Sequence, residues 1–318
     1  MNEYENLSYP DRSAYDTARP EVIVAELAHE RPEREPVPAV ARRRVLLPAL
    51  LFAATCLSTL FVGSLNADPS LGWGHMLARG FMYGGALMTI LIFHEAGHFL
   101  QARRYGVYAT FPFFIPMPIS PIGTFGAVIA MDPRRGDRKA LFDIGISGPL
   151  AGLVPTLVFC ALGLHWSRVI AVPEGAGGMF LGEPLLFKFL ARAIVGPLPQ
   201  GHDILLHPIA FAGWVGLLIT ALNLLPIGQL DGGHILYGLL RRRAHQVASA
   251  LLLAAAVAVI WYGLWGWTLM LMLLALMGPA HPPTADDHVP LGTFRTMLGW
   301  ATLAFIPIGF TPIPFSLG

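Results

Sequence analysis

The segment His94-Glu95-Ala96-Gly97-His98 places two imidazoles and a carboxylate within little more than one turn of a predicted helix. Four residues of α-helix rotate by about 400°, so His94 and His98 lie on one face, one turn apart. At that spacing both imidazoles can bind one tetrahedral zinc ion, and Glu95 stands beside them as a general base for water. The pattern therefore predicts zinc-dependent hydrolysis.

The composition of the chain indicates that this motif lies in a membrane protein. Of the 318 residues, 54% are hydrophobic and only 13% are charged, which is about half the charged share of a soluble domain. So little charge cannot cover a water-facing surface, and this excludes an ordinary soluble enzyme. A charge inside a bilayer is costly unless it is paired or ligated, so an acidic residue such as Glu95 is expected to have a function there.

Apolar stretches predict an all-α polytopic fold with about seven membrane-spanning helices. The stretch 247–278 is too long for one span and contains a break at 262–267, so we expect two short helices within it. The stretch 166–206 is expected to be an external loop with a short interfacial helix around Leu185–Ala193. The other predicted spans cover about 45–65, 80–100, 141–165, 207–226 and 297–313.

Clusters of basic residues orient these spans. If the spans alternate, every cluster falls on one side, which the positive-inside rule identifies as the cytoplasm. Residues 1–44 are polar and acidic, so we expect a disordered cytoplasmic tail before a membrane-embedded domain over 45–318. Transit peptides are poor in acidic residues, which favours a bacterial plasma membrane for this chain. The basic clusters are Arg42–Arg44, Arg103–Arg104, Arg134–Lys139 and Arg241–Arg243.

Residues 109–130 are apolar but contain four prolines and two glycines. Proline at this density excludes a helix, and arginines flank the segment on both sides, so both of its ends should lie on the same membrane face. We therefore expect a re-entrant extended hairpin near the active site, because irregular backbone at membrane depth survives only where protein or a wet cavity surrounds it. The alternative is an interfacial loop.

A catalytic zinc site needs a third protein ligand and one open position. Downstream of the histidines, the acidic residues within apolar helical stretches are Asp143 and Asp231. Asp231 is expected at the membrane depth of the two histidines, which makes it the favoured ligand. For Asp143 we expect a bond to the backbone or to an arginine such as Arg138. His234 is either a hydrogen-bonding partner of the ligands or without a role.

Two motifs in this order resemble the site-2 protease family of intramembrane zinc metalloproteases. The family's hallmark is H-E-x-x-H followed by N-x-x-P-x-x-x-L-D-G, and residues 223–232 read Asn-Leu-Leu-Pro-Ile-Gly-Gln-Leu-Asp-Gly. Gly145–Gly152 is similar to the family's small-residue motif in the intervening helix. The stretches Gly123–Ile129 and His281–Thr284 are similar to a subgroup with plant plastid and bacterial members. The resemblance covers about 80–240, and no PDZ domain is apparent.

This resemblance implies a role for each matching residue. His94, His98 and Asp231 would bind Zn²⁺, and Glu95 would act first as the base and then as the acid for the leaving amine. Asn223 would help to bind the substrate or the oxyanion. The implied activity is an intramembrane zinc metalloendopeptidase that cuts peptide bonds in or near transmembrane segments, as in regulated intramembrane proteolysis.

A transmembrane substrate must unwind before its amides can be reached, and the 109–130 hairpin could hold the unwound segment. We hypothesise that the edge strand Gly123–Ile129, with Phe125, Gly126 and Val128, pairs with the substrate and holds it over the zinc. The expected partners are thus a transmembrane protein and the lipid bilayer, with no nucleic acid. The sequence leaves the oligomeric state open.

Three other interpretations remain. A metal-binding membrane transporter would use His and Asp along an ion path, but it has no use for Glu95 and would often show paired broken helices. A non-proteolytic membrane receptor would not need an intact Glu95. A structural histidine cluster bonded to neighbouring helices would leave three polar residues in an apolar helix without chemistry.

Overall fold

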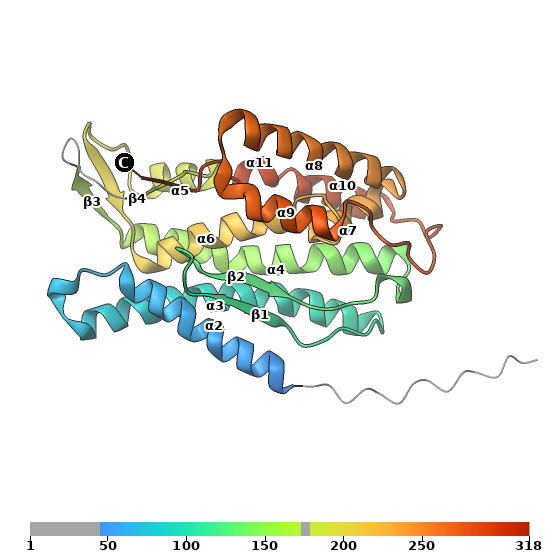
Figure 1. Cartoon of the computed structure of the whole chain (residues 1–318), viewed down its shortest axis with the longest axis horizontal. Coiled ribbons are helices and arrows are strands. Elements are labelled where there is room, and N and C mark those ends of the chain that lie inside the picture. Colours follow the sequence, from blue (N-terminus) through green and yellow to red (C-terminus); the bar gives the residue numbers. More distant parts are fainter. Residues whose placement is uncertain (1–44, 173–178, 318) are drawn as a thin grey trace, which may run out of the picture. The chain divides into compact units, whose positions relative to one another are not determined.

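The structure is a computed structural model that describes residues 45–172 and 179–317. The tail expected over residues 1–44 lies outside the described residues. Figure 1 shows the arrangement of the elements. The helices of the described residues are α2 (Leu46–Leu65), α3 (Trp73–Arg104), α4 (Arg138–His165), α5 (Leu185–Ile194), α6 (Pro208–Asn223), α7 (Asp231–Leu240), α8 (Arg243–Tyr262), α9 (Thr268–Met277), α10 (Thr293–Leu303) and α11 (Ile306–Gly309).

Four helices in the described part of the chain, α2, α3, α4 and α8, are long and apolar enough to cross a membrane. Helix α6 and residues 265–277 are apolar as well but shorter. These helices support a multi-pass membrane protein. The count of seven spans predicted from the sequence is not confirmed.

The last predicted span, 297–313, is not one continuous helix. Helix α10 ends at Leu303, α11 forms one further turn over Ile306–Gly309, and the chain then becomes extended. Prolines explain the break, because Pro307 has no N–H to continue a helix and Pro312 and Pro314 hold the following backbone extended.

The break predicted within 247–278 is confirmed. Helix α8 ends at Tyr262, and the following Gly263 has a φ of +67°, the left-handed conformation that terminates helices. The short 3₁₀ turn η4 (Trp265–Trp267) then leads into α9. Helix α8 is longer than expected, because it begins at Arg243 rather than near 247.

The fold is not purely helical, which corrects the all-α prediction. Three antiparallel pairs occur among the described residues: β1–β2, β3–β5 and β4–β6. The extended conformation predicted within 109–130 is present as β1–β2, whereas its re-entrant position in a membrane stays a prediction. The strands are β1 (Phe113–Met117), β2 (Gly123–Val128), β3 (Arg168–Ala171), β4 (Met179–Leu181), β5 (His202–Leu205) and β6 (Phe315–Leu317).

The two pairs that the sequence did not predict involve the stretch 166–206. The short helix expected there is confirmed as α5 (Leu185–Ile194). Strands β3 and β5 run against each other over four residues each, and β4 pairs with β6 from the other end of the chain. All four residues of β3 are exposed, and its sequence Arg-Val-Ile-Ala lacks the alternation of apolar and polar residues that identifies a half-buried strand.

Hydrogen bonds from two helices hold the β1–β2 hairpin in place. Ser58 Oγ of α2 donates to the carbonyl of Gly123 at 2.5 Å, and Tyr83 Oη of α3 donates to the carbonyl of Ile122 at 2.7 Å. Gly123 has a φ of +86°, and an added Cβ would lie 3.0 Å from Thr59 Cα. The turn before β2 therefore requires glycine.

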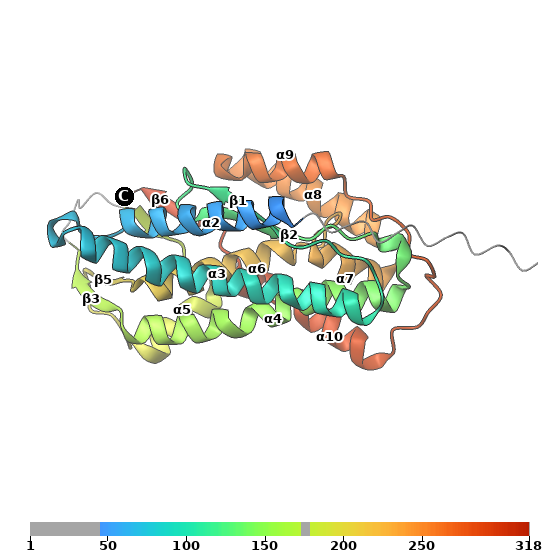
Figure 2. The same ribbon diagram turned by 90° about the horizontal axis from the view of Figure 1, so that it is seen from below.

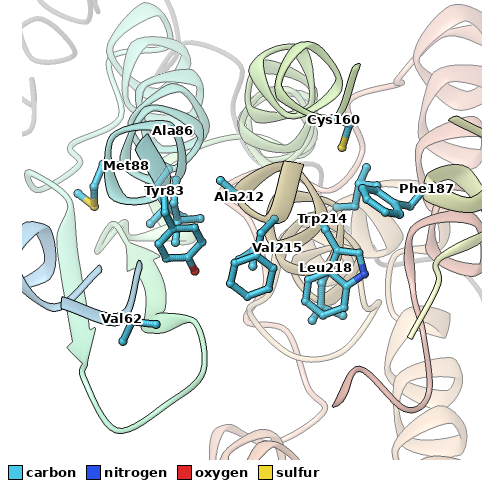
Figure 3. Close-up of a cluster of buried hydrophobic side chains, with 14 of the residues drawn as sticks. Val62, Tyr83, Ala86, Met88, Cys160, Phe187, Ala212, Trp214, Val215 and Leu218 are labelled. Atoms are coloured by element: carbon cyan, nitrogen blue, oxygen red, sulfur yellow. The ribbon is translucent and has the colours of Figure 1, made fainter. Parts of the chain in front are cut away.

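The core lies where α3, α4 and α6 pack against one another, side by side in both ribbon views (Figures 1 and 2). Small residues permit close contact: a Cβ on Gly163 of α4 would lie 2.1 Å from the backbone nitrogen of Ala210, at the start of α6. Figure 3 shows the buried side chains that fill the space between these helices, including Tyr83, Cys160 and Trp214. This rigid framework supports the polar groups described next.

Candidate metal centre

Helix α3 carries His94, Glu95 and His98, and all three side chains are buried. The two imidazoles project from adjacent turns, with ring centroids 4.9 Å apart and their Nε2 atoms separated by 3.2 Å. Helical spacing alone brings these two nitrogens together, as the sequence motif predicted.

Asp231 reaches the same point from the first residue of α7. Helix α6 ends at Asn223, and the chain turns through Gly228, with a φ of +57°, before α7 begins. The turn packs tightly on the new helix, since a Cβ on Gly232 would lie 1.8 Å from the carbonyl oxygen of Leu224. In this arrangement the two oxygens of Asp231 lie 3.1 Å from His94 Nε2 and 3.2 Å from His98 Nε2.

The donor atoms of His94, His98 and Asp231 form a group that could hold one metal ion. Bond lengths of about 2.0–2.1 Å in a tetrahedral zinc site require donor atoms about 3.3 Å apart. The observed separations of 3.1 and 3.2 Å match that requirement. His98 Nδ1 lies 2.8 Å from the carbonyl of Ile144 and donates to it, which leaves Nε2 unprotonated and free to bind a metal. The residues present therefore fit a zinc ion.

Helix α4 contributes no ligand, but it presents glycines to both imidazoles. An added Cβ on Gly148 would lie 2.0 Å from His98 Nε2, and one on Gly152 would lie 3.0 Å from His94 Cβ. In the other direction, a Cβ on Gly97 of α3 would lie 2.5 Å from the carbonyl oxygen of Ser147. The small-residue motif of α4 thus lets the helix backbone support the two rings directly.

Glu95 and Asn223 border the metal group. Glu95 is only 3% exposed, and its carboxylate interacts electrostatically with His94, His98 and Asp231. The amide nitrogen of Asn223 lies 3.2 Å from His94 Nε2. The structure thus brings all five residues that the sequence predicted for metal binding and catalysis to one place.

Four of the five residues predicted to bind substrate, Gly123, Phe125, Gly126 and Val128, lie on strand β2, and the fifth is Asn223 at the end of α6. Phe125 and Val128 are about half exposed. Among the described strands β2 pairs only with β1, so its second edge has no strand partner. Thr124 and Phe125 line a cavity of about 650 Å³, and Asn223 lines the same cavity. The cavity therefore extends from the hairpin to Asn223.

Asp143 does not belong to this group. It lies at the beginning of α4 and accepts two hydrogen bonds from Arg295 of α10, Nε to Oδ1 at 2.7 Å and Nη2 to Oδ2 at 2.9 Å, and a third from Tyr105. The expected arginine partner was Arg138, which instead donates to the carbonyl of Gly238 at 2.7 Å. Asp143 therefore binds an arginine, as expected, but this arginine is Arg295, which is far from it in the sequence.

The sequence pattern predicts no role for His281, and it leaves His234 either as a partner of the ligands or without a role. In the structure His234 Nδ1 lies 2.7 Å from His281 Nε2, and both rings are buried. The signal in the sequence is the stretch His281–Thr284, but spacing alone does not identify His234 as its partner.

Comparison with known proteins assigns residues 83–263 to a family model described as Peptidase family M50. The chain is 39% identical over 160 residues to a probable zinc metalloprotease EGY1, chloroplastic, of Oryza sativa subsp. japonica, covering 48% of this chain and 27% of that protein. It is 30% identical over 243 residues to the Arabidopsis thaliana EGY1, covering 71% and 42%. It is 28% identical over 299 residues to the Arabidopsis thaliana EGY2, covering 89% and 53%.

The chain thus spans about half or less of the length of these relatives. Their names place them in chloroplasts, which does not support the bacterial plasma membrane expected from the sequence. No solved structure matches the chain.

Proposed function

The chain belongs to peptidase family M50, and on that premise we propose that it is a zinc metalloendopeptidase that hydrolyses peptide bonds in or near transmembrane segments of membrane proteins. The observation that carries this proposal is the group of three donor atoms, 3.1–3.2 Å apart, with the buried Glu95 beside it. Buried acids and histidines without chemistry would be costly in an apolar helix.

His94, His98 and Asp231 would hold the zinc ion, which when bound lowers the pKa of water and polarises a peptide carbonyl. Glu95 takes the proton of the attacking water and later delivers it to the leaving amine. The amide of Asn223, 3.2 Å from His94 Nε2, donates to the oxyanion that develops on the carbonyl. Glu95 and Asn223 both lie beside the three metal ligands, so these roles can act on one peptide bond.

The substrate is an extended segment of a membrane protein. A helix satisfies its own amides, so it must unwind before a peptide bond can reach Glu95. The open edge of β2 offers the hydrogen bonds that an unwound segment has lost. The cavity beside Thr124, Phe125 and Asn223 offers apolar surface for its side chains. Regulated intramembrane proteolysis, with the bilayer and a transmembrane protein as partners, is the process that this site suits.

The test compares the full-length wild type with Glu95→Gln, both purified in detergent. Glutamine keeps the size of Glu95 but cannot accept the proton, and it leaves the three metal ligands untouched. We measure zinc per chain by elemental analysis and cleavage of single-span substrates of varied sequence. One zinc in both proteins with cleavage only in the wild type is the expected result.

Three other results would contradict the proposal. Zinc in both proteins with no cleavage of any substrate would favour the non-proteolytic receptor. Absence of zinc from the wild type, also after incubation with the metal, would remove the metal centre. Zinc passage across vesicles that contain the protein, unaffected by Glu95→Gln, would instead favour the transporter.

A further inference from the structure

Residues 281–289, here called the strap, run between α9 and α10 without helix or strand and lie against α7. Helix α7 begins with Asp231 and has only ten residues. The distance between α7 and the imidazoles of α3 therefore decides whether Asp231, the third ligand, reaches the metal. The strap contacts the helix one and two turns after Asp231, through His234 and Tyr237.

His281 makes the central contact of the strap. Its Nδ1 lies 2.6 Å from the carbonyl of Pro282 and donates to it, so a neutral His281 presents a bare Nε2. That nitrogen accepts from His234 Nδ1 at 2.7 Å. Burial lowers the pKa of His281 to about 4 and that of His234 to about 3, so both rings are neutral near pH 7. The pair is a single buried hydrogen bond with a defined donor and acceptor.

Tyr237 makes the second contact. Its ring stacks on His281 with centroids 4.6 Å apart, and on His245 of α8 with centroids 5.8 Å apart. Its hydroxyl donates to Asp287 at 2.8 Å, and Thr284 donates to the other oxygen of Asp287 at 2.7 Å. The strap thus contacts two side chains, His234 and Tyr237, on successive turns of α7.

The strap is in turn fixed to the framework of the fold. Ala285 N donates to the carbonyl of Gly136 at 2.9 Å, and Arg138 N donates to the carbonyl of Asp286 at 3.0 Å. The side chain of Arg138 joins α7 and the strap, since it donates to Gly238 and more weakly to Val289. His234 also contacts α4, because a Cβ on Gly145 of α4 would lie 2.7 Å from His234 Cβ. His234 is therefore in contact with both α4 and the strap.

We propose that the strap sets the position of Asp231, with His281 as a positioning residue that acts through His234 and the rigid turn between them. The inference rests on the proposed zinc site. This hydrogen bond limits which residues can replace His281, because the side chain at position 281 must place an acceptor where Nε2 lies. Glutamine can place an oxygen there, whereas asparagine carries its polar atoms only as far as Nδ1.

The experiment uses the full chain in detergent and the variants His281→Ala, His281→Gln, His281→Asn and Tyr237→Phe. His288→Ala is the matched control, because His288 lies in the same segment with an exposed side chain. We measure zinc affinity by competition with a chromogenic chelator, the visible spectrum of the Co²⁺-loaded protein, kcat, KM and the Tm of the metal-free protein.

We expect His281→Ala and His281→Asn to weaken zinc binding by about 10- to 100-fold, the range for groups that orient metal ligands. Their cobalt spectra should change and kcat should fall more than KM rises. His281→Gln should recover most of the affinity, and His288→Ala should match the wild type. If His281→Ala does not fold, Tyr237→Phe, which keeps the ring, should show a smaller effect in the same direction.

Wild-type zinc affinity and cobalt spectrum in His281→Ala would overturn the inference, as would equal losses in the Ala and Gln variants. A lower Tm of the metal-free protein with unchanged affinity would also overturn it, because the strap would then only stabilise the fold. If the wild type binds no zinc, the proposed function fails first, so the two failures are distinguishable.

Discussion

Replacing Gly148 by alanine should strongly weaken zinc binding without unfolding the protein. An alanine Cβ at this position would lie 2.0 Å from His98 Nε2, 2.3 Å from its Cδ2 and 2.4 Å from its Cε1, whereas ordinary contact begins near 3.4 Å. The imidazole must therefore retreat by about 1.4 Å, or α4 must move away by a similar distance. Metal–ligand bonds tolerate about 0.2 Å, so the ring would move about seven times farther than the site allows.

The cost to the fold is expected to be small. Overpacking of this kind costs about 1–3 kcal/mol, and replacing glycine within a helix returns about 1 kcal/mol. The metal-free variant should thus have a Tm within several degrees of the metal-free wild type. Zinc affinity, measured by chelator competition, should fall by a factor on the order of 100 or more, and cleavage should be lost with it.

Two further glycines provide a graded comparison. A Cβ on Gly152 would lie 3.0 Å from His94 Cβ and 3.2 Å from its Nδ1, so Gly152→Ala needs a shift of only a few tenths of an ångström and should keep its zinc. Gly85 of α3 faces open space, and Gly85→Ala should match the wild type. Normal zinc affinity in Gly148→Ala would refute the reasoning, and equal losses at Gly148 and Gly152 would show that the contact distance does not decide the outcome.

Three other predictions concern the residues around the metal. Asn223→Ala should lower kcat by about 100-fold while zinc content stays at the wild-type level; an unchanged kcat would exclude Asn223 from oxyanion binding. Val128→Pro should abolish cleavage with zinc retained if the edge of β2 holds the substrate, and full activity would exclude that role; Gly126 is unsuitable for this test because its φ of +97° is closed to proline. Acidification should loosen the strap, because burial lowers the pKa of His281 from 6.5 to about 4 and the unfolded chain therefore binds a proton that the folded chain does not. This contribution is complete above pH 6.5 and is lost as the pH falls toward 4, on the order of 3 kcal/mol in total. Thermal unfolding of the wild type and His281→Gln across this range measures it, and identical pH profiles would count against it. The groups that face His281 are His234, Tyr237, His245 and Asp287.

The metal group could be predicted from sequence because each of its ligands lies in a short segment with a recognisable local pattern. His94 and His98 meet through helical spacing alone. Asp231 follows a break in the helical pattern that contains a proline and a glycine. This break, at the expected membrane depth of the histidines, indicated that Asp231 lies near them. Family resemblance implied the same residue, whose carboxylate oxygens lie 3.1 and 3.2 Å from the imidazole nitrogens in the structure.

The supports of the site could not be predicted, because they join residues far apart without a periodic pattern. His234 and His281 are 47 residues apart, and Asp143 and Arg295 are 152 apart. Arg138 was the nearer partner for Asp143 in the sequence, yet its side chain binds the carbonyl of Gly238 instead. A short exposed strand such as β3 pairs only because the fold brings β5 beside it.

The ligands of the metal group depend on two supports that act on different members. The imidazoles belong to the long helix α3 and rest against the glycines of α4, so their separation is fixed by backbone contact. Asp231 belongs to a ten-residue helix that follows a turn, and the bonds of His234 and Tyr237 hold that helix in place. The position of the carboxylate should therefore be more sensitive to changes in distant side chains than that of the imidazoles. Substitutions in the strap should lower metal affinity through Asp231 alone, whereas substitutions on α4 should displace a histidine, and the cobalt spectra of the two classes should differ accordingly.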